Sequence, residues 1–296
     1  MDLPFGVLAV YAALAVWSVL LVRGLKKRTF GLFLVFGIGL LLVLNVRYLI
    51  EGAPAAIAFF IGIYDVLDNI GLATGEGARA LASCPDNACT VWGDYYVQHP
   101  SWGVAFHDRF LNGPEFRTNL LYAHIVCNSI VFVLMHLQLA RPGGSARGTW
   151  HRALGRISFA ILTVGTISAV WLASEHGPVG EYGGDLSAYG FYSMSFCVYG
   201  CAVMGVLAIR RGDAALHRIW MIRFAGAMWG AFWLFRVMLF VQGPLLRDWE
   251  AANLLVCIWF SAPLGILIAE VVRRRILDRR PLQESAGLRD APAAVG

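Results

Sequence analysis

The sequence predicts an all-α, polytopic membrane helix bundle of seven transmembrane helices, with the N-terminus outside and the C-terminus inside. Of its 296 residues, 58% are hydrophobic and 15% are charged, whereas an average soluble domain is roughly 25% charged. The mean hydropathy is +0.63. The apolar residues also fall into seven runs, each near the ~20 residues with which a helix crosses a bilayer.

The seven runs predict the membrane spans in chain order. The first run is followed, not preceded, by the basic cluster "RGLKKR", which favours a retained first helix over a cleaved signal peptide. A shorter, acid-capped run at 53–67 is predicted to be interfacial or re-entrant. The predicted spans are 4–22, 30–50, 119–140, 153–173, 187–208, 219–242 and 251–272.

The distribution of charges predicts the orientation of the spans. With the N-terminus outside, the inner segments 23–29, 141–152, 209–218 and 273–296 hold 16 of the 24 Lys and Arg residues, and 14 of the 19 acidic residues lie outside. This asymmetry is the one expected when basic loops stay in the cytoplasm. The net charge of +5 therefore matters less than the positions of the charges along the chain, and we expect no nucleic-acid partner.

The spans divide the chain into four parts. Residues 1–50 form two N-terminal transmembrane helices, 51–118 an extracytoplasmic loop or cap, 119–272 a five-helix core and 273–296 a basic, partly disordered cytoplasmic tail. The outer loop contains Cys84 and Cys89 in "SCPDNACT". A disulfide is the favoured interpretation of this pair outside the cytoplasm, because a zinc site needs more ligands than the loop offers nearby.

Histidines within the core sort by depth into two layers. His136, His151 and His217 lie toward the cytoplasm, and His124 and His176 lie toward the outside. Histidine imidazoles commonly hold haem iron, so the layers suggest a b-type haem. His124 and His136 are twelve residues apart on one helix, about 120° from a shared face. That spacing disfavours two haems stacked along this helix but not a single haem.

A basic pattern repeats at the cytoplasmic mouths of two core helices. "TWHRALGRISFA" carries His151, Arg152 and Arg156, and "ALHRIWMIRFAG" carries His217, Arg218 and Arg223. A single such Arg often extends to lipid phosphate. The repetition at one membrane level instead predicts a shared anionic ligand, such as a haem propionate, a quinone carbonyl, a lipid phosphate or a partner's carboxylate.

These residues resemble an uncharacterised bacterial family of predicted membrane proteins with a domain of unknown function. The family pattern has a helix His, a later Gln, HR-x-x-G-R and R-x-x-D-x-x-x-H-R-x-W-M-x-R. Here it is matched by His124, Gln138, "HRALGR" and Arg210 to Arg223, within about residues 110–240. His136 is not expected from the pattern. The resemblance implies a multi-pass protein of the bacterial inner (cytoplasmic) membrane but no established activity. A looser likeness to haem-binding cytochrome b bundles rests on histidines in adjacent helices.

Three functions remain open from the sequence. The first is a b-type haem protein that transfers electrons and is linked to quinol. Its ligand candidates are His124, His151 and His217. The side chains expected to bind the haem propionates or the substrate are Arg152, Arg156, Arg218 and Arg223. The second is an intramembrane hydrolase with zinc on His136, His151 and His217, in which Asp213 is the only nearby acid. Among the metal-ligand candidates we also count His124. The third is a non-catalytic subunit or assembly factor of a larger membrane complex, with Gly226, Ala227, Gly230 and Ala231 packing against a partner.

Overall fold

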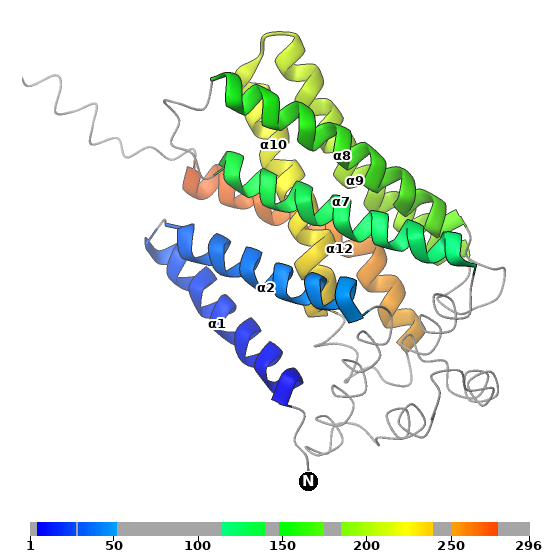
Figure 1. Ribbon diagram of the computed structural model, residues 1–296. Helices are drawn as coiled ribbons and strands as arrows, with labels where there is room; N and C mark the ends of the chain where they lie inside the picture. Colours follow the sequence, from blue (N-terminus) through cyan, green and yellow to red (C-terminus); the bar gives the residue numbers. More distant parts are fainter. Residues whose placement is uncertain are drawn as a thin grey trace, which may run out of the picture.

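The computed structural model describes residues 5–27, 29–51, 114–139, 148–174, 185–238 and 250–277. Within these ranges the protein is all-helical, with seven α-helices and two π-helical segments (Figure 1). Several predicted features lie outside the described residues: the Cys84–Cys89 disulfide, the segment 53–67, nearly all of the outer cap, His176 and the tail beyond 277.

Each α-helix overlaps one of the predicted apolar runs. Most ends shift by a few residues, whereas α10 ends at Trp229, well before the end of the predicted run 219–242. Two of them continue into a π-helical segment, η1 after α10 and η3 after α12. The bounds are α1 Phe5–Lys27, α2 Gly31–Glu51, α7 Glu115–Leu139, α8 Thr149–Ser174, α9 Asp185–Arg210, α10 Ala214–Trp229, η1 Gly230–Leu234, α12 Glu250–Val272 and η3 Arg273–Leu277.

Four helices in the described residues are long and apolar enough to cross a membrane. They are α7, α8, α9 and the segment Leu255–Arg275, which takes in most of α12 and the start of η3. A shorter apolar segment, Gly31–Val43, lies within α2. Because a lipid-exposed backbone must satisfy its own hydrogen bonds, these helices indicate a multi-pass helical membrane protein.

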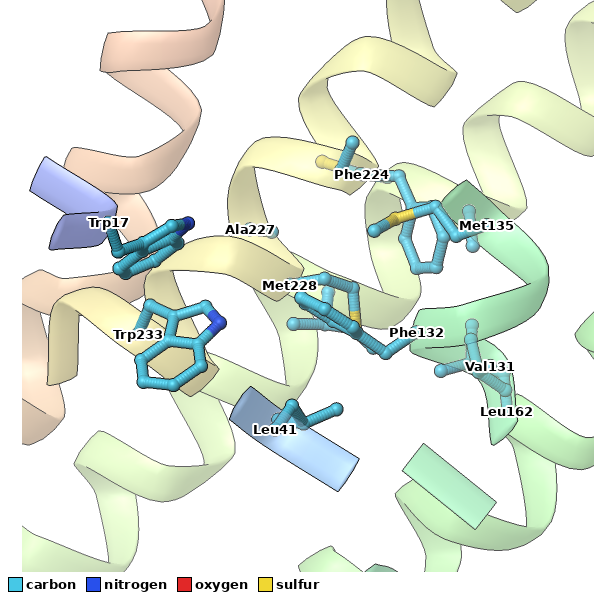
Figure 2. Packing of buried hydrophobic residues seen from close by; sticks show 14 residues of the cluster. Trp17, Leu41, Val131, Phe132, Met135, Leu162, Phe224, Ala227, Met228 and Trp233 are labelled. Atoms are coloured by element: carbon cyan, nitrogen blue, oxygen red, sulfur yellow. The ribbon is translucent and has the colours of Figure 1, made fainter. Parts of the chain in front are cut away.

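Helix α10 lies at the centre of the described bundle, between α9 and α12 (Figure 1). Its run Phe224–Met228 is buried throughout. Around it gather side chains from the other helices, among them Trp17 of α1, Leu41 of α2 and Phe132 of α7 (Figure 2). Within the described residues, this core therefore includes side chains of α1 and α2 as well as side chains of the later helices.

Helix α10 approaches α12 at three glycines. A Cβ added at Gly226 would lie 2.5 Å from the carbonyl oxygen of Gly265, and one at Gly230 would lie 2.8 Å from the Cα of Ala262. Small residues allow backbones to approach this closely in membranes. The sequence offered Gly226 and Gly230 as evidence for an external partner, and this inference was wrong because α12 of the same chain occupies that face.

The π-helical segment η1 begins at this close approach. A π-helical turn widens the helix and rotates the residues after it. Trp233, within η1, is buried, with its ring centroid 4.5 Å from that of Trp17. Trp17 also stacks on Phe33 at 4.9 Å and donates a hydrogen bond to the Phe33 carbonyl at 3.0 Å. These aromatic contacts join α1 and α2 to the end of α10.

Candidate functional site

The turn between α9 and α10 fixes the start of α10. Gly212 has φ +79°, a left-handed conformation that glycine adopts without steric cost and that commonly ends helices. The backbone N–H groups of Gly212 and Asp213 bond to carbonyls of the last turn of α9, Ile209 and Ala208, both at 3.0 Å. The Asp213 carboxylate then accepts from the Leu216 N–H at 2.8 Å as an N-cap.

The N-cap places His217 against the neighbouring helix. His217 Nδ1 lies 2.8 Å from the backbone carbonyl of Gly205 on α9. A carbonyl oxygen only accepts, so Nδ1 carries the hydrogen, and in the neutral imidazole Nε2 keeps its lone pair. A bond from the other ring nitrogen to a backbone carbonyl is typical of metal-ligating histidines.

His151, in the first turn of α8, lies beside His217. The ring centroids are 6.4 Å apart and the ring planes make an angle of 86°. Both side chains are partly buried. The structure thus brings together the two histidines of the repeated basic pattern, at the same end of the bundle.

The four arginines of the pattern do not share one environment. Arg152, Arg156 and Arg218 are exposed, whereas Arg223 lies against Glu270 on α12 with its Nε 3.4 Å from Oε2. The guanidinium of Arg223 also lies 4.7 Å from the centroid of the Trp220 ring, within the range of a cation–π contact. The structure therefore brings the two histidines of the repeated pattern together. Arg223, the deepest arginine of the pattern on α10, instead belongs to a separate cluster around Glu270.

The sequence of the basic pattern corresponds to a known family. A family described as "Predicted membrane protein (DUF2306)" matches residues 121–272, slightly more than half of the chain. The chain belongs to this family. No curated protein and no solved structure matches it. No haem-binding family matches, so the likeness to cytochrome b bundles stays a prediction.

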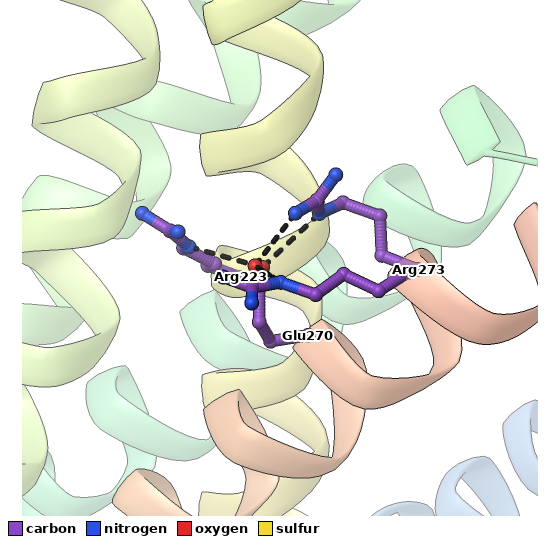
Figure 3. Close-up of polar contacts among 4 residues, drawn as sticks. Arg223, Glu270 and Arg273 are labelled. Atoms are coloured by element: carbon purple, nitrogen blue, oxygen red, sulfur yellow. Dashed lines mark hydrogen bonds and ion pairs between the residues drawn. The ribbon is translucent and has the colours of Figure 1, made fainter. Parts of the chain in front are cut away.

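Glu270 lies inside the family region and was missed by sequence reasoning, which named Asp213 as the only nearby acid. It is 14% exposed and accepts from three arginines. Arg273 Nη2 and Arg274 Nε each lie 2.6 Å from Oε1, and Arg223 Nε approaches Oε2 from α10 (Figure 3). The spacing in "EVVRRR", with arginines three and four residues after the acid, was a signal for such pairs.

His136, the histidine not expected from the family pattern, lies in the aromatic core. Only 2% exposed, it has its ring centroid 4.4 Å from Phe132 and 5.1 Å from Trp229. Its Nδ1 donates to the Phe132 carbonyl at 2.6 Å, and Nε2 has no hydrogen-bond partner among the described residues. The His136 side chain therefore packs between α7 and α10, and its Nε2 is buried without a hydrogen-bond partner among the described residues.

His124 and Asn128 form a polar contact between α7 and α8. His124 Nδ1 lies 3.0 Å from Asn128 Nδ2 and 3.3 Å from the carbonyl of Gly165. Only one of these contacts is a hydrogen bond at a time, because Nδ1 either accepts from the amide or donates to the carbonyl. Asn128 Nδ2 also donates to the His124 carbonyl at 2.9 Å.

The candidate metal ligands are thus spread over three places: the His151–His217 pair, the aromatic core and the α7–α8 contact. Within the part of the chain that the structure describes, no group of three or more His, Cys, Asp or Glu side chains is arranged to hold a metal ion. The three histidines named for a zinc site, His136, His151 and His217, are consequently not gathered as one ligand set. The paired histidines are the strongest candidate for a cofactor.

Proposed function

We propose that the chain is a seven-span electron-transfer protein of the bacterial inner membrane that holds a b-type haem on His151 and His217. The observation that carries this proposal is the 6.4 Å separation of the two ring centroids. A metal–imidazole nitrogen bond is ~2 Å long, so two imidazoles on opposite sides of one iron have centroids about 6 Å apart. Perpendicular ring planes are compatible with such a pair.

Hydrogen bonding and charge near the pair support the same proposal. The His217 Nδ1–H bond to the Gly205 carbonyl selects the tautomer whose Nε2 lone pair would be available to hold a haem iron, and it fixes the ring orientation. The exposed Arg152, Arg156 and Arg218 follow the two histidines on their helices and suit the negative charge of the propionates. A bound haem would supply a one-electron carrier, and we propose a membrane quinol as its donor.

The proposed orientation, N-terminus outside and C-terminus inside, rests on the Lys and Arg count. We expect a C-terminal green fluorescent protein fusion to fluoresce and a C-terminal alkaline phosphatase fusion to be inactive, because the basic inner segments stay in the cytoplasm. Fusions after Glu51 should behave in the opposite way. Active phosphatase at the C-terminus would contradict the topology.

Absorbance spectroscopy tests the haem directly. Full-length protein from haem-replete cells should show a Soret band, with sharpened visible bands after dithionite or a short-chain quinol. His217→Ala and His151→Ala should each lose most of this absorbance. His217→Met should retain haem with a raised reduction potential, because methionine is an alternative axial ligand.

The control is His124→Gln, which changes a histidine of the α7–α8 contact. It should leave the spectrum unchanged if the pair on α8 and α10 holds the haem. A colourless preparation of the unaltered protein would contradict the proposal, and stoichiometric zinc in that preparation would favour the hydrolase instead. Loss of haem in His124→Gln alone would move the site to the outer half of the bundle.

A further inference from the structure

The cluster around Glu270 contains more positive than negative charge. Three guanidinium groups, on Arg223, Arg273 and Arg274, contact one carboxylate (Figure 3). The Glu270 oxygens accept four bonds from them, at 2.6 Å twice, 3.1 Å and 3.4 Å. The carboxylate is therefore saturated with donors, and the cluster keeps an excess of two positive charges.

Two of the guanidinium groups have donors left for a ligand. Arg223 and Arg274 reach Glu270 through Nε, and their Nη groups make no hydrogen bond within the described residues. Each guanidinium has five N–H donors in a planar fork that matches the oxygens of a phosphate. Glu270 thus fixes the orientation of two forks while leaving their outer donors available.

The cluster lies at the end of an exposed apolar stripe on α12. Arg274 is 68% exposed and follows an exposed apolar stripe on one face of α12, made of Leu264, Leu267, Ile268 and Val271. The stripe ends one turn before Arg274, so an acyl chain lying along it would bring its headgroup to the guanidinium groups. Trp220, beside Arg223, is a residue type enriched at membrane interfaces.

We propose that the Glu270 cluster binds the phosphate of an anionic phospholipid, with Arg223 and Arg274 as the phosphate ligands and Glu270 as the residue that positions them. Basic pockets between transmembrane helices are known to hold anionic lipid headgroups. The excess positive charge favours a lipid of net negative charge over a zwitterionic one. The stripe favours a lipid over a free phosphate ion.

Delipidated, full-length protein in detergent is the sample for this test. Titration with phosphatidylglycerol should raise the apparent Tm and give a retained lipid in native mass spectrometry. Phosphatidylcholine should do neither at the same concentration. Glycerol 3-phosphate, which has the headgroup chemistry without acyl chains, should need at least a hundredfold higher concentration.

Matched arginine variants locate the site. Arg274→Gln and Arg223→Gln should each weaken phosphatidylglycerol binding at least tenfold. Arg275→Gln removes the same charge one residue later and should change binding less than twofold. If Arg223→Gln does not fold, the exposed Arg274 still provides the comparison with Arg275.

Three results would overturn the proposal. Equal losses in Arg274→Gln and Arg275→Gln would indicate general surface charge. Equal binding of phosphatidylcholine would show no recognition of an anionic headgroup, and equal potency of glycerol 3-phosphate would indicate a site for small anions. None of these outcomes depends on whether the protein contains haem.

Discussion

Gly230→Val is expected to separate α10 from α12 and to prevent most of the protein from folding. An added Cβ at Gly230 would lie 2.8 Å from the Cα of Ala262 and 2.9 Å from the Ser261 carbonyl carbon. These are backbone atoms, so a rotamer change on α12 does not relieve the clash. Overpacking a core with one side chain costs ~1–3 kcal/mol, and displacing a central helix costs more.

The measurement is the yield of monodisperse protein in detergent and its apparent Tm. We expect Gly230→Val to lose most of the monodisperse peak and to lower the Tm of the remainder by about 10 °C or more. The matched control is Gly39→Val on α2, where an added Cβ meets no atom within 4 Å. Equal stability of the two variants would contradict the close approach of α10 and α12.

The positions of the helices could be predicted from sequence because a bilayer leaves few alternatives. An apolar run of about 20 residues must satisfy its backbone hydrogen bonds internally, and a helix does this. The runs at 153–173 and 187–208 accordingly lie inside α8 and α9. The run at 219–242 gave no sign that α10 would change to a π-helix at Gly230, the residue that closely approaches Ser261 and Ala262 of α12.

The candidate site was predicted only in part, because the sequence pattern gives the depth of a side chain but not the direction in which it points. The repeated pattern predicted that His151 and His217 would lie at one level, and their rings are neighbours. The same argument of depth grouped His136 with them, but depth does not specify the rotation of a helix about its axis. Helix α7 turns His136 toward Phe132 and Trp229, and among the described residues it belongs to no group of three or more His, Cys, Asp or Glu side chains that could hold a metal ion.

Arg223 and Glu270 illustrate the other limit of sequence reasoning. Forty-seven residues separate them, and only the packing of α10 on α12 brings them together. The "RRR" after the last span was interpreted as part of a basic tail, where charges are usually solvated. An acid one turn earlier in an apolar helix is costly without a partner, and this cost was the available clue that Glu270 has one.

Glu270→Gln is expected to destabilise the protein because it leaves three arginines without their carboxylate. Arg223 and Arg273 are only 26% and 13% exposed, so water compensates them poorly. Removing one partner of a fully buried ion pair costs ~3–5 kcal/mol. For this partly exposed cluster we expect about 2–3 kcal/mol, observed as a lower Tm in detergent. Glu115→Gln, an exposed acid at the start of α7, is the control and should change the Tm little.

A double variant distinguishes lost charge pairing from lost packing. Glu270→Gln together with Arg223→Gln removes the acid and the arginine that reaches it from α10. Because an uncompensated buried charge costs more than a neutral pair, the double variant should be more stable than Glu270→Gln alone. If its loss of stability instead equals the sum of the two single losses, the residues are not coupled, and α10 and α12 would be held together by their glycine contact without the ion pair.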